Sequence, residues 1–383
     1  MRIVIDATNL RDGGGVTHLV QILNYSNLSK TFFEEIIVLG CKQTLAQIDD
    51  KPYIKKIHKK VFEKNYAVRF LWLSLKFDSF LKQRKADLLF APGGSFFTSF
   101  HPVVTMSRNS LPLELKEAKR YGISLMYFRL LFLRYIQKRS FLKSDGFIFL
   151  THYAKEIFVQ QGWFKSKNIN HKISIIPHGV APVLIDLTSA IPPQEKIISI
   201  DNPFKIIYVS IIDVYKHQDK VALAVEKLNG EGYFIEINFV GPYYNPAFIN
   251  FNDILARMPD GVRQTIKYHG KLNAAQQSVL YSQMDCILFA SSCENMPNIL
   301  LEGMSSGLPI ICSNRGPMPE ILKTAGEYFN PESIESICTA IMKLYNSVEL
   351  RSSLAKKSFQ LSKSYSWKKC SNETFQFLAE FKR

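Results

Sequence analysis

Residues 286–313, CILFASSCENMPNILLEGMSSGLPIICS, alternate a short apolar run, a polar loop, a helix-length stretch and a second apolar run. Each apolar run has the length and composition of a buried strand. Pro297 is well suited to the first turn of the intervening helix, and Gly307 marks its expected end. The stretch therefore predicts a strand, a helix and a second strand, the alternation from which parallel sheets are built.

The same alternation runs along the 383 residues and restarts after a polar, proline-containing stretch at 181–203. The runs that predict buried strands are Ile3–Asp6, Ile36–Leu39, Leu88–Phe90, Val103–Met106, Phe147–Leu150, Lys205–Val209, Ile235–Val240, Thr265–His269, Cys286–Phe289 and Ile310–Ser313. We therefore expect an α/β protein with two facing, doubly wound, Rossmann-like domains and a ligand site in the cleft between them. The expected parts are residues 1–185, a linker at 186–203, residues 204–364, and a C-terminal helix at 365–383 that crosses back to the first domain.

The composition is that of a globular protein, with 46% hydrophobic and 21% charged residues. The six cysteines form no CxxC pair and lie mostly inside apolar runs, which favours reduced thiols over a zinc site. The chain begins with the strand-like MRIVIDA, so we expect no secretory signal. No apolar run approaches the roughly 20 residues needed to span a bilayer. These features predict a cytoplasmic protein.

The net charge of +15 is concentrated in the first half of the chain. Residues 1–190 hold 28 Lys and Arg against 14 Asp and Glu, whereas the remainder holds 20 against 19. The asymmetry indicates an anionic partner for the first half, either a nucleic acid or a negatively charged membrane surface.

Two segments at predicted strand ends suit phosphate groups. Gly13–Gly15 lead from the first strand into a helix, where backbone amides and the helix dipole favour an anion. The alternative is a loop that only needs left-handed backbone angles. Lys216 follows the strand Lys205–Val209 and can place its ammonium beside a pyrophosphate, unless it is an ordinary surface lysine. The glycine pattern is not GxGxxG, so a dinucleotide site is not indicated.

Two glutamates flank the predicted start of the helix in the opening stretch. Glu294 lies in the strand-to-helix loop, and Glu302 lies about one turn inside the helix. Carboxylates are acceptor-only groups that can accept from two neighbouring hydroxyls, such as those of a ribose or a hexose. The alternative for Glu302 is a modest interaction with the helix dipole, worth about 0.3–1 kcal/mol.

The stretch Ser-Ser-x-Glu-x-x-Pro-x-x-Leu-Leu-Glu-Gly-Met-Ser-Ser-Gly-Leu-Pro-Ile closely resembles the family 4 retaining glycosyltransferases of the GT-B fold. The resemblance extends over most of the chain and includes the glycine loop, residues 173–180, Lys216 and the closing residues 365–367. It implies that Glu294 binds hydroxyls of the transferred sugar, Glu302 binds the ribose and Lys216 neutralises the leaving diphosphate. The donor-binding residues that it implies are Gly14, Gly15, Lys216, Glu294, Met296, Pro297, Asn298, Ile299 and Glu302. No metal ion or other cofactor is implied.

The sequence departs from the family pattern in two places. Ser210-Ile211 stand where the family has a Gly-Arg pair, so one phosphate-binding cation is missing. Ser107-Arg108-Asn109 follow a strand after which many members place a histidine on the acceptor side. Arg108 or Asn109 would take that catalytic position, with Arg108 as a substitute cation. The alternative is that Arg108 pairs with a neighbouring loop.

Two basic segments interleave Lys and Arg with aromatic residues and leucine, at 51–85 and 121–143. At helical spacing this composition suits a surface helix on anionic lipid, or a helix packed on the core with a basic polar face. The charge bias favours the membrane. We therefore expect a lipid-linked saccharide acceptor at the inner face of the cytoplasmic membrane, as in the synthesis of bacterial lipopolysaccharide O-antigen or capsule.

The expected function is transfer of a hexose-type sugar from a UDP-, GDP- or ADP-linked donor to a saccharide acceptor. A GT-B nucleotide-sugar epimerase would instead convert the donor without an acceptor. A non-enzymatic polyanion-binding protein would bind with a steep salt dependence, but no nucleic-acid recognition motif supports a nucleic acid partner.

Overall fold

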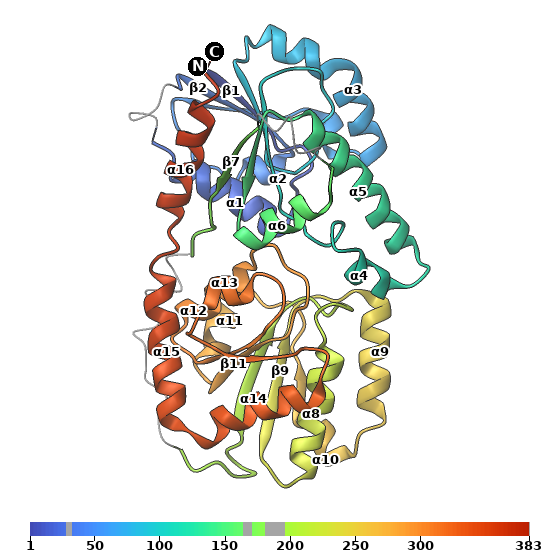
Figure 1. Cartoon of the computed structure of the whole chain (residues 1–383), viewed down its shortest axis with the longest axis vertical. Helices are drawn as coiled ribbons and strands as arrows, with labels where there is room; N and C mark the ends of the chain where they lie inside the picture. The colour runs from blue at the N-terminus through green and yellow to red at the C-terminus, as the bar shows by residue number, and fades with distance from the viewer. Residues whose placement is uncertain (28–32, 164–170, 181–195, 383) are drawn as a thin grey trace. The chain divides into compact units, whose positions relative to one another are not determined.

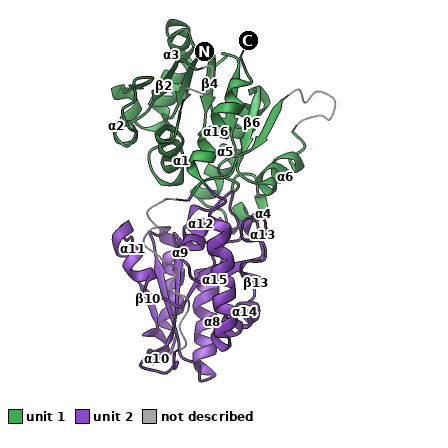
Figure 2. Ribbon diagram, turned by 90° about the vertical axis from the view of Figure 1, so that its left-hand side faces the viewer, with its two compact units in different colours: residues 1–118, 123–179, 366–383 green, residues 119–122, 180–365 purple. Residues whose placement is uncertain are grey.

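A computed structural model describes residues 1–27, 33–163, 171–180 and 196–382. The chain forms two compact units, which are coloured separately in Figure 2. Unit 1 comprises residues 1–118, 123–179 and 366–383, and unit 2 comprises residues 119–122 and 180–365. Residues 186–195 of the expected linker lie outside the described residues.

The described residues of unit 1 form a seven-stranded sheet in the order β3-β2-β1-β4-β5-β6-β7, and all neighbouring strands are parallel. The strands are β1 (Arg2–Asp6), β2 (Glu35–Leu39), β3 (Ile54–Ile57), β4 (Leu88–Ala91), β5 (Val103–Met106), β6 (Gly146–Phe149) and β7 (Lys172–Ile175). Ile3, Val4 and Ile5 of the central β1 are fully buried. Their continuous apolar run reflects a strand that is covered on both faces of the sheet.

Helices surround the sheet of unit 1 (Figure 1). They are α1 (Gly13–Asn24), α2 (Lys42–Leu45), η2 (Lys60–Glu63), α3 (Tyr66–Gln83), α4 (Leu115–Ala118), α5 (Leu125–Lys143), α6 (His152–Gln160) and α16 (Trp367–Ala379). The C-terminal α16 packs against α1, where the Ser371 hydroxyl donates to the Ile22 carbonyl at 2.6 Å. Phe77 of α3 and Ile136 of α5 share one core cluster with Leu89 of β4. The two long helices α3 and α5 therefore cover the same part of the core.

The described residues of unit 2 form a six-stranded parallel sheet in the order β10-β9-β8-β11-β12-β13. The strands are β8 (Phe204–Val209), β9 (Ile235–Val240), β10 (Ile266–Tyr268), β11 (Cys286–Phe289), β12 (Ile310–Ser313) and β13 (Glu327–Phe329). The strand order reverses between β8 and β11, and ligands of open α/β sheets bind at such a point.

Helices of unit 2 connect these parallel strands, and the last two helices follow the last strand. They are α8 (Gln218–Gly230), α9 (Asn245–Ala256), α10 (Asp260–Arg263), α11 (Ala274–Tyr281), α12 (Asn298–Ser305), α13 (Met318–Leu322), α14 (Ile334–Asn346) and α15 (Val348–Ser362), with the short η3 (Lys119–Tyr121) from the earlier part of the chain. The two parallel α/β sheets predicted from the sequence are confirmed.

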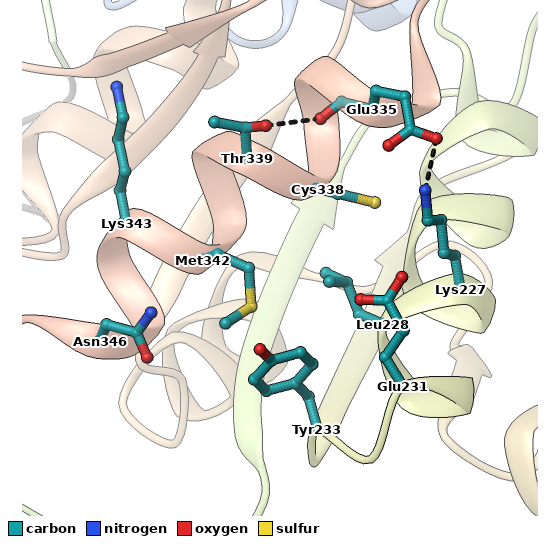
Figure 3. Close-up of a pocket in the computed structure, with 10 residues that line it drawn as sticks. All are labelled: Lys227, Leu228, Glu231, Tyr233, Glu335, Cys338, Thr339, Met342, Lys343 and Asn346. Carbon is teal, nitrogen blue, oxygen red and sulfur yellow. Dashed lines mark hydrogen bonds and ion pairs between the residues drawn. The ribbon is translucent and has the colours of Figure 1, made fainter.

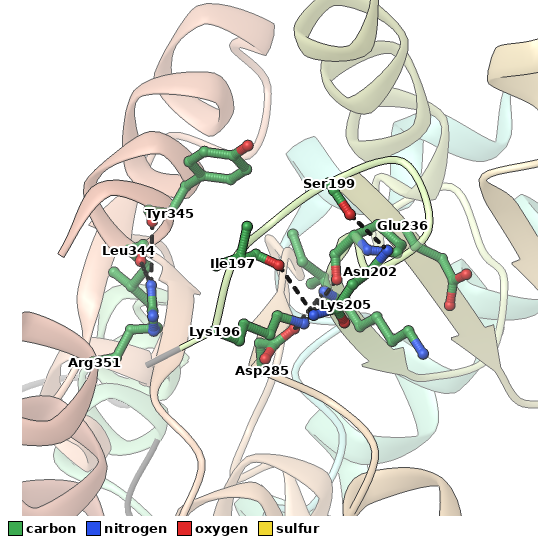
Figure 4. A network of polar contacts seen from close by, with 12 residues as sticks. Lys196, Ile197, Ser199, Asn202, Lys205, Glu236, Asp285, Leu344, Tyr345 and Arg351 are labelled. Atoms are coloured by element: carbon green, nitrogen blue, oxygen red, sulfur yellow. Dashed lines mark hydrogen bonds and ion pairs between the residues drawn. The ribbon is translucent and has the colours of Figure 1, made fainter. Parts of the chain in front are cut away.

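A polar network fixes the beginning of unit 2 at the edge of its core (Figure 4). The Asp285 carboxylate accepts from the backbone amide of Lys205 at 2.7 Å and pairs with the Lys196 ammonium at 2.5 Å. The buried Arg351 donates to the carbonyls of Leu344 and Tyr345, which lie in the last turn of α14. These contacts satisfy carbonyls that a helix C-terminus leaves unpaired.

The expectation of helical spacing across residues 51–85 is wrong for its first part. Residues 54–57 form β3, a strand at the edge of the sheet, and η2 separates it from α3. An edge strand accommodates lysines because one side faces solvent, and Lys55 pairs there with Glu35 of β2. The edge strand β13 was also not predicted. Pro297 precedes α12 at the N-cap position, so it does not belong to the first turn.

Two further predictions concern the cysteines and the apolarity of the helices. All six cysteines are buried free thiols, as their positions predicted. In the part of the chain that the structure describes, every helix falls short of the length and apolarity that a bilayer crossing requires.

Candidate functional site

The polar residues singled out in unit 2 follow two neighbouring strands. Lys216 lies in the turn between β8 and α8, and Glu294 lies in the loop between β11 and α12. Strands β8 and β11 are hydrogen-bonded neighbours, with Ile206 opposite Cys286. Their carboxyl ends therefore share one edge, and the Lys216 ammonium forms an ion pair with the Glu294 carboxylate across 78 positions of sequence.

This ion pair is mostly buried. The exposed fraction is 8% for the Lys216 side chain and 15% for that of Glu294. The Lys216 ammonium also lies 5.1 Å from the ring centre of Tyr215 and 5.3 Å from that of Phe289. Burial, followed by the negative charge of Glu294, raises the pKa of Tyr215 and of Tyr208 well above the usual tyrosine value. Each charge is compensated by its partner, so removal of one would leave the other buried and unpaired.

The two loops that carry the ion pair are also held to each other by hydrogen bonds. The Ser292 amide donates to the Tyr215 carbonyl at 2.9 Å. The Ser292 hydroxyl and the His217 Nε2 atom lie 2.9 Å apart, within hydrogen-bond distance. His217 has a left-handed backbone with φ of 53°, which a histidine adopts only in a constrained turn. The loops thus hold Lys216 and Glu294 in place before a ligand arrives.

The start of α12 lies next along the chain. No side chain caps this helix, which begins at Asn298 after Pro297. Met296 is buried and Ile299 is half-buried. Among the described residues, the buried Oδ1 atom of Asn298 has no hydrogen-bond partner. An uncapped helix start provides amide donors and a positive dipole end, both of which suit a phosphate or a sugar oxygen.

Glu302 lies on the second turn of α12, as the sequence predicted. Its carboxylate has no hydrogen bond or ion pair among the described residues, and burial raises its pKa. The buried Tyr281 of α11 is a neighbour that the sequence did not indicate: burial, and then the charge of Glu302, raise the pKa of its hydroxyl. The hydrogen-bond capacity of the Glu302 carboxylate is therefore available to a hydroxyl-bearing ligand.

The glycine turn of unit 1 is held by Arg108. The Arg108 guanidinium donates to the carbonyl of Gly14 at 2.5 Å and to that of Gly15 at 3.0 Å. Burial lowers the pKa of Arg108 to about 10. Gly13, the first residue of α1, has a left-handed φ of 68°. In this structure Arg108 contacts the neighbouring loop, and its predicted role as a substitute cation stays a prediction.

Asn109 forms a local turn, because its side-chain oxygen accepts from the Leu111 amide at 3.1 Å. The acceptor-side role predicted for Asn109 likewise stays a prediction.

Beside Arg108, unit 1 buries a cluster that the sequence did not indicate. The rings of His18 and His178 lie 4.8 Å apart, and Trp367 lies within 6 Å of both. Burial, followed by the charge of Arg108, lowers the pKa of both histidines well below the usual value, so both are neutral.

Two hollows lie away from the residues predicted to bind the donor. A cavity of about 20 Å³ in unit 1 lies at the end of β1 and is lined by Asp6, Asn9, Tyr66, Arg69 and other residues. It has room for about one water molecule. A larger groove of about 400 Å³ lies between α8 and α14 (Figure 3). None of the predicted donor-binding residues lines either hollow.

Residues 192–361 match the family described as glycosyl transferases group 1. This span contains Lys216, Glu294, all of α12 and Glu302. Over these residues the chain is similar to the group 1 glycosyltransferases. Gly14, Gly15, Arg108 and Asn109 lie outside the match.

A curated relative matches part of the chain. The O-antigen chain mannosyltransferase B of Escherichia coli is 26% identical over 125 residues, which cover 32% of this chain and 33% of that protein. The match thus spans about a third of the length of this relative.

Two solved structures match nearly the whole chain. The sucrose-phosphate synthase of Thermosynechococcus elongatus has a TM-score of 0.72 at 14% identity, with 98% of each chain covered. The HepE protein of Anabaena, in complex with UDP and glucose, has a TM-score of 0.69 at 15% identity and the same coverage. The protein therefore has the GT-B fold that the sequence predicted.

Proposed function

We propose that the protein is a retaining glycosyltransferase of the family 4 type. It transfers a hexose-type sugar from a nucleotide sugar to a saccharide acceptor. The observation that carries this proposal is the buried Lys216–Glu294 ion pair beside the uncapped start of α12, with Glu302 one turn further along the helix. All three side chains lie inside the residues that match the group 1 glycosyltransferases.

When the donor binds, the Lys216–Glu294 ion pair would break, and each of the two side chains would contact a group of the donor instead. The diphosphate takes the place of Glu294 beside the Lys216 ammonium, and the sugar hydroxyls donate to the released Glu294 carboxylate. The backbone amides around Met296–Ile299 orient the sugar and the diphosphate. Glu302, which has no partner among the described residues, accepts from the ribose hydroxyls. Gly14 and Gly15 contribute backbone contacts to the diphosphate.

The reaction breaks the bond between the anomeric carbon and the diphosphate oxygen, and forms a bond from the same carbon to an acceptor hydroxyl oxygen. Positive charge develops on the sugar and negative charge on the diphosphate, so stabilisation of the leaving group by Lys216 and amide donors is the main contribution. In the front-face route that the family resemblance implies, the acceptor proton passes to an oxygen of the leaving phosphate.

The donor is a UDP-, GDP- or ADP-linked sugar. The complex of HepE with UDP and glucose makes UDP the first nucleotide to examine. We propose that no metal ion or other cofactor takes part. Transfer should accordingly persist after treatment with EDTA.

The acceptor is a lipid-linked saccharide in the synthesis of a bacterial surface polysaccharide. The protein would work in the cytoplasm, at the inner face of the cytoplasmic membrane. Two observations support this: the excess of 28 basic over 14 acidic residues in the first half of the chain, and the similarity to an O-antigen mannosyltransferase.

A two-stage experiment tests the function. Thermal shifts with UDP-, GDP- and ADP-linked sugars identify the donor, and release of the nucleoside diphosphate is then measured with and without lipid-linked saccharides. We expect that release of the nucleoside diphosphate depends on the acceptor. NMR of the product should show the same anomeric configuration as in the donor. Conversion of the donor into another nucleotide sugar without acceptor would instead identify an epimerase, and an inverted linkage would contradict retention.

A further inference from the structure

Helix α5 has apolar residues on both of its faces. Leu130, Ile136 and Phe141 are buried against unit 1. The outward stripe carries large apolar side chains with exposed fractions between 43% and 90%: Leu125, Phe128, Phe132, Tyr135 and Leu142. Spacings of three, four, three and seven residues keep this stripe on one side of the helix. A contiguous stripe of exposed large apolar side chains indicates an interaction site, and nothing in the described residues covers this stripe.

Helix α3 repeats the arrangement. Phe77, Phe80 and Leu81 are buried, whereas Val68, Leu71 and Leu75 have exposed fractions between 42% and 69%. Scattered single apolar residues on a surface need no explanation, but a contiguous group indicates an interaction site.

Helices α3 and α5 lie on the same side of unit 1 (Figure 1). Both helices pack on the same core cluster. Phe97 joins them directly: its ring lies 4.7 Å from that of Phe70 on α3, and the Arg139 guanidinium of α5 lies 5.7 Å from its centre. We call the exposed residues of α3 and α5, together with the adjoining Ile123, the α3–α5 surface.

The charge of this surface has one sign. Helix α5 contains five basic residues and no acidic residue: Arg129, Arg134, Lys138, Arg139 and Lys143. The Arg134 guanidinium donates to the Leu113 carbonyl at 3.1 Å, so it is engaged within unit 1 and does not count toward the charge of the surface. Helix α3 contains three basic residues and a single acid, Asp78. The Asp78 carboxylate accepts from the Ser99 amide at 3.2 Å and is therefore engaged by the adjoining loop. Apolar side chains interleaved with basic ones are complementary to the acyl and headgroup layers of an anionic bilayer.

We propose that the α3–α5 surface is a membrane-docking surface that lies on anionic phospholipid. The exposed leucine and phenylalanine side chains insert at the boundary of the acyl chains, Tyr135 lies at the interface, and the basic residues contact lipid phosphates. This proposal rests on the proposed function, because a lipid-linked acceptor is the reason for the protein to approach a membrane. The docking residues lie on α5 and on the exposed side of α3. The edge strand β3 does not belong to the docking surface.

Vesicle flotation tests the surface. The full-length protein is mixed with vesicles of phosphatidylcholine alone, or of phosphatidylcholine with phosphatidylglycerol. The wild type should float only with the anionic vesicles. The double variant Phe128→Glu with Phe132→Glu should lower the bound fraction about tenfold or more, because it removes inserted apolar area and adds repulsion. Each of Arg129→Gln and Lys138→Gln should weaken binding about fivefold.

A matched control is Val159→Glu, which places the same charge on an exposed apolar position of α6 and should float like the wild type. All substituted side chains are exposed, so melting temperatures should stay near that of the wild type. Wild-type binding to neither vesicle, or unchanged binding of the double variant, would overturn the proposal. Light scattering that shows a wild-type dimer and a monomeric double variant, without flotation, would instead make the surface a self-association face.

Nucleotide-sugar thermal shifts, run on the same samples, separate this proposal from the proposed function. A protein that binds a donor but does not float contradicts only the docking surface. A protein that floats but binds no donor contradicts the glycosyltransferase proposal and leaves the docking surface standing.

Discussion

Helices α1 and α12 both begin just after a buried strand, and the sequence suggested a phosphate-binding backbone at each. Their surroundings differ. At α1 the buried Arg108 guanidinium is engaged by the carbonyls of Gly14 and Gly15. At α12, Glu302 has no partner among the described residues. Neither helix start is capped by a side chain. The comparison indicates that both helix starts leave backbone amides for a ligand, and that they differ in the side chain beside them: an arginine engaged by carbonyls at α1, and a carboxylate with free acceptor capacity at α12.

The largest expected effect concerns the ion pair near α12. Lys216→Ala or Glu294→Ala should lower the rate of sugar transfer about 10²–10³-fold, because each removes charge complementarity to the reacting donor. The half-buried Lys220→Ala on α8 serves as a control and should transfer at the wild-type rate. Steady-state rates of nucleoside diphosphate release measure the effect.

Stability measurements on the same pair show whether it is also structural. Each single variant leaves an unpaired buried charge and should melt below the wild type. The double variant Lys216→Met with Glu294→Gln should recover much of that stability and none of the activity. Activity in the double variant would mean that the pair only maintains the fold.

A smaller effect is expected at Arg108. Arg108→Lys keeps a positive charge but loses the fork that reaches two carbonyls. The free energy of unfolding should fall by about 1–3 kcal/mol in chemical denaturation, with nucleotide affinity nearly unchanged. The exposed Arg129→Lys is the matched control. If Arg108→Lys instead removes nucleotide affinity at wild-type stability, Arg108 contacts the donor and the contrast between the two helix starts fails.

The smallest expected effect is the contribution of Glu302 to the pH dependence of the melting temperature. A raised pKa means that the folded protein holds this proton more tightly than the unfolded chain does. The stabilisation from Glu302 is therefore present at low pH and is lost as pH rises from the ordinary carboxyl pKa through the raised one. Glu302→Gln cannot ionise, so without ligand it should melt about 1–2 °C higher at about pH 7.

The pH series provides the check on that prediction. The gain of Glu302→Gln over the wild type should shrink as pH is lowered into the carboxyl range. A gain that is the same at all pH values would show that ionisation of Glu302 is not its cause.

The parts of the fold that repeat a local pattern could be predicted from the sequence. Strands such as Cys286–Phe289 are continuous apolar runs, and the loop and helix that carry Glu294 and Glu302 follow that run. The edge strand β3 was missed because its central residues are two lysines, which are compatible with a strand only at a sheet edge.

Contacts that depend on strand order could not be predicted. Lys216 meets Glu294 because β8 lies beside β11, although β9 and β10 come between them in sequence. The engagement of Arg108 by the glycine turn, and the burial of His18 beside His178, likewise join segments far apart in the chain. No local spacing records such pairings.

We propose that the two glutamates hold different parts of one donor. Calorimetric titration of the free nucleoside diphosphate into Glu294→Ala and Glu302→Ala separates their roles, with the diphosphate chosen by the thermal-shift screen. Glu302→Ala should weaken affinity about tenfold or more, since it loses charged hydrogen bonds to the ribose, while Glu294→Ala should bind within a few fold of the wild type. Equal losses of affinity in the two variants would show that the glutamates do not divide the donor between them.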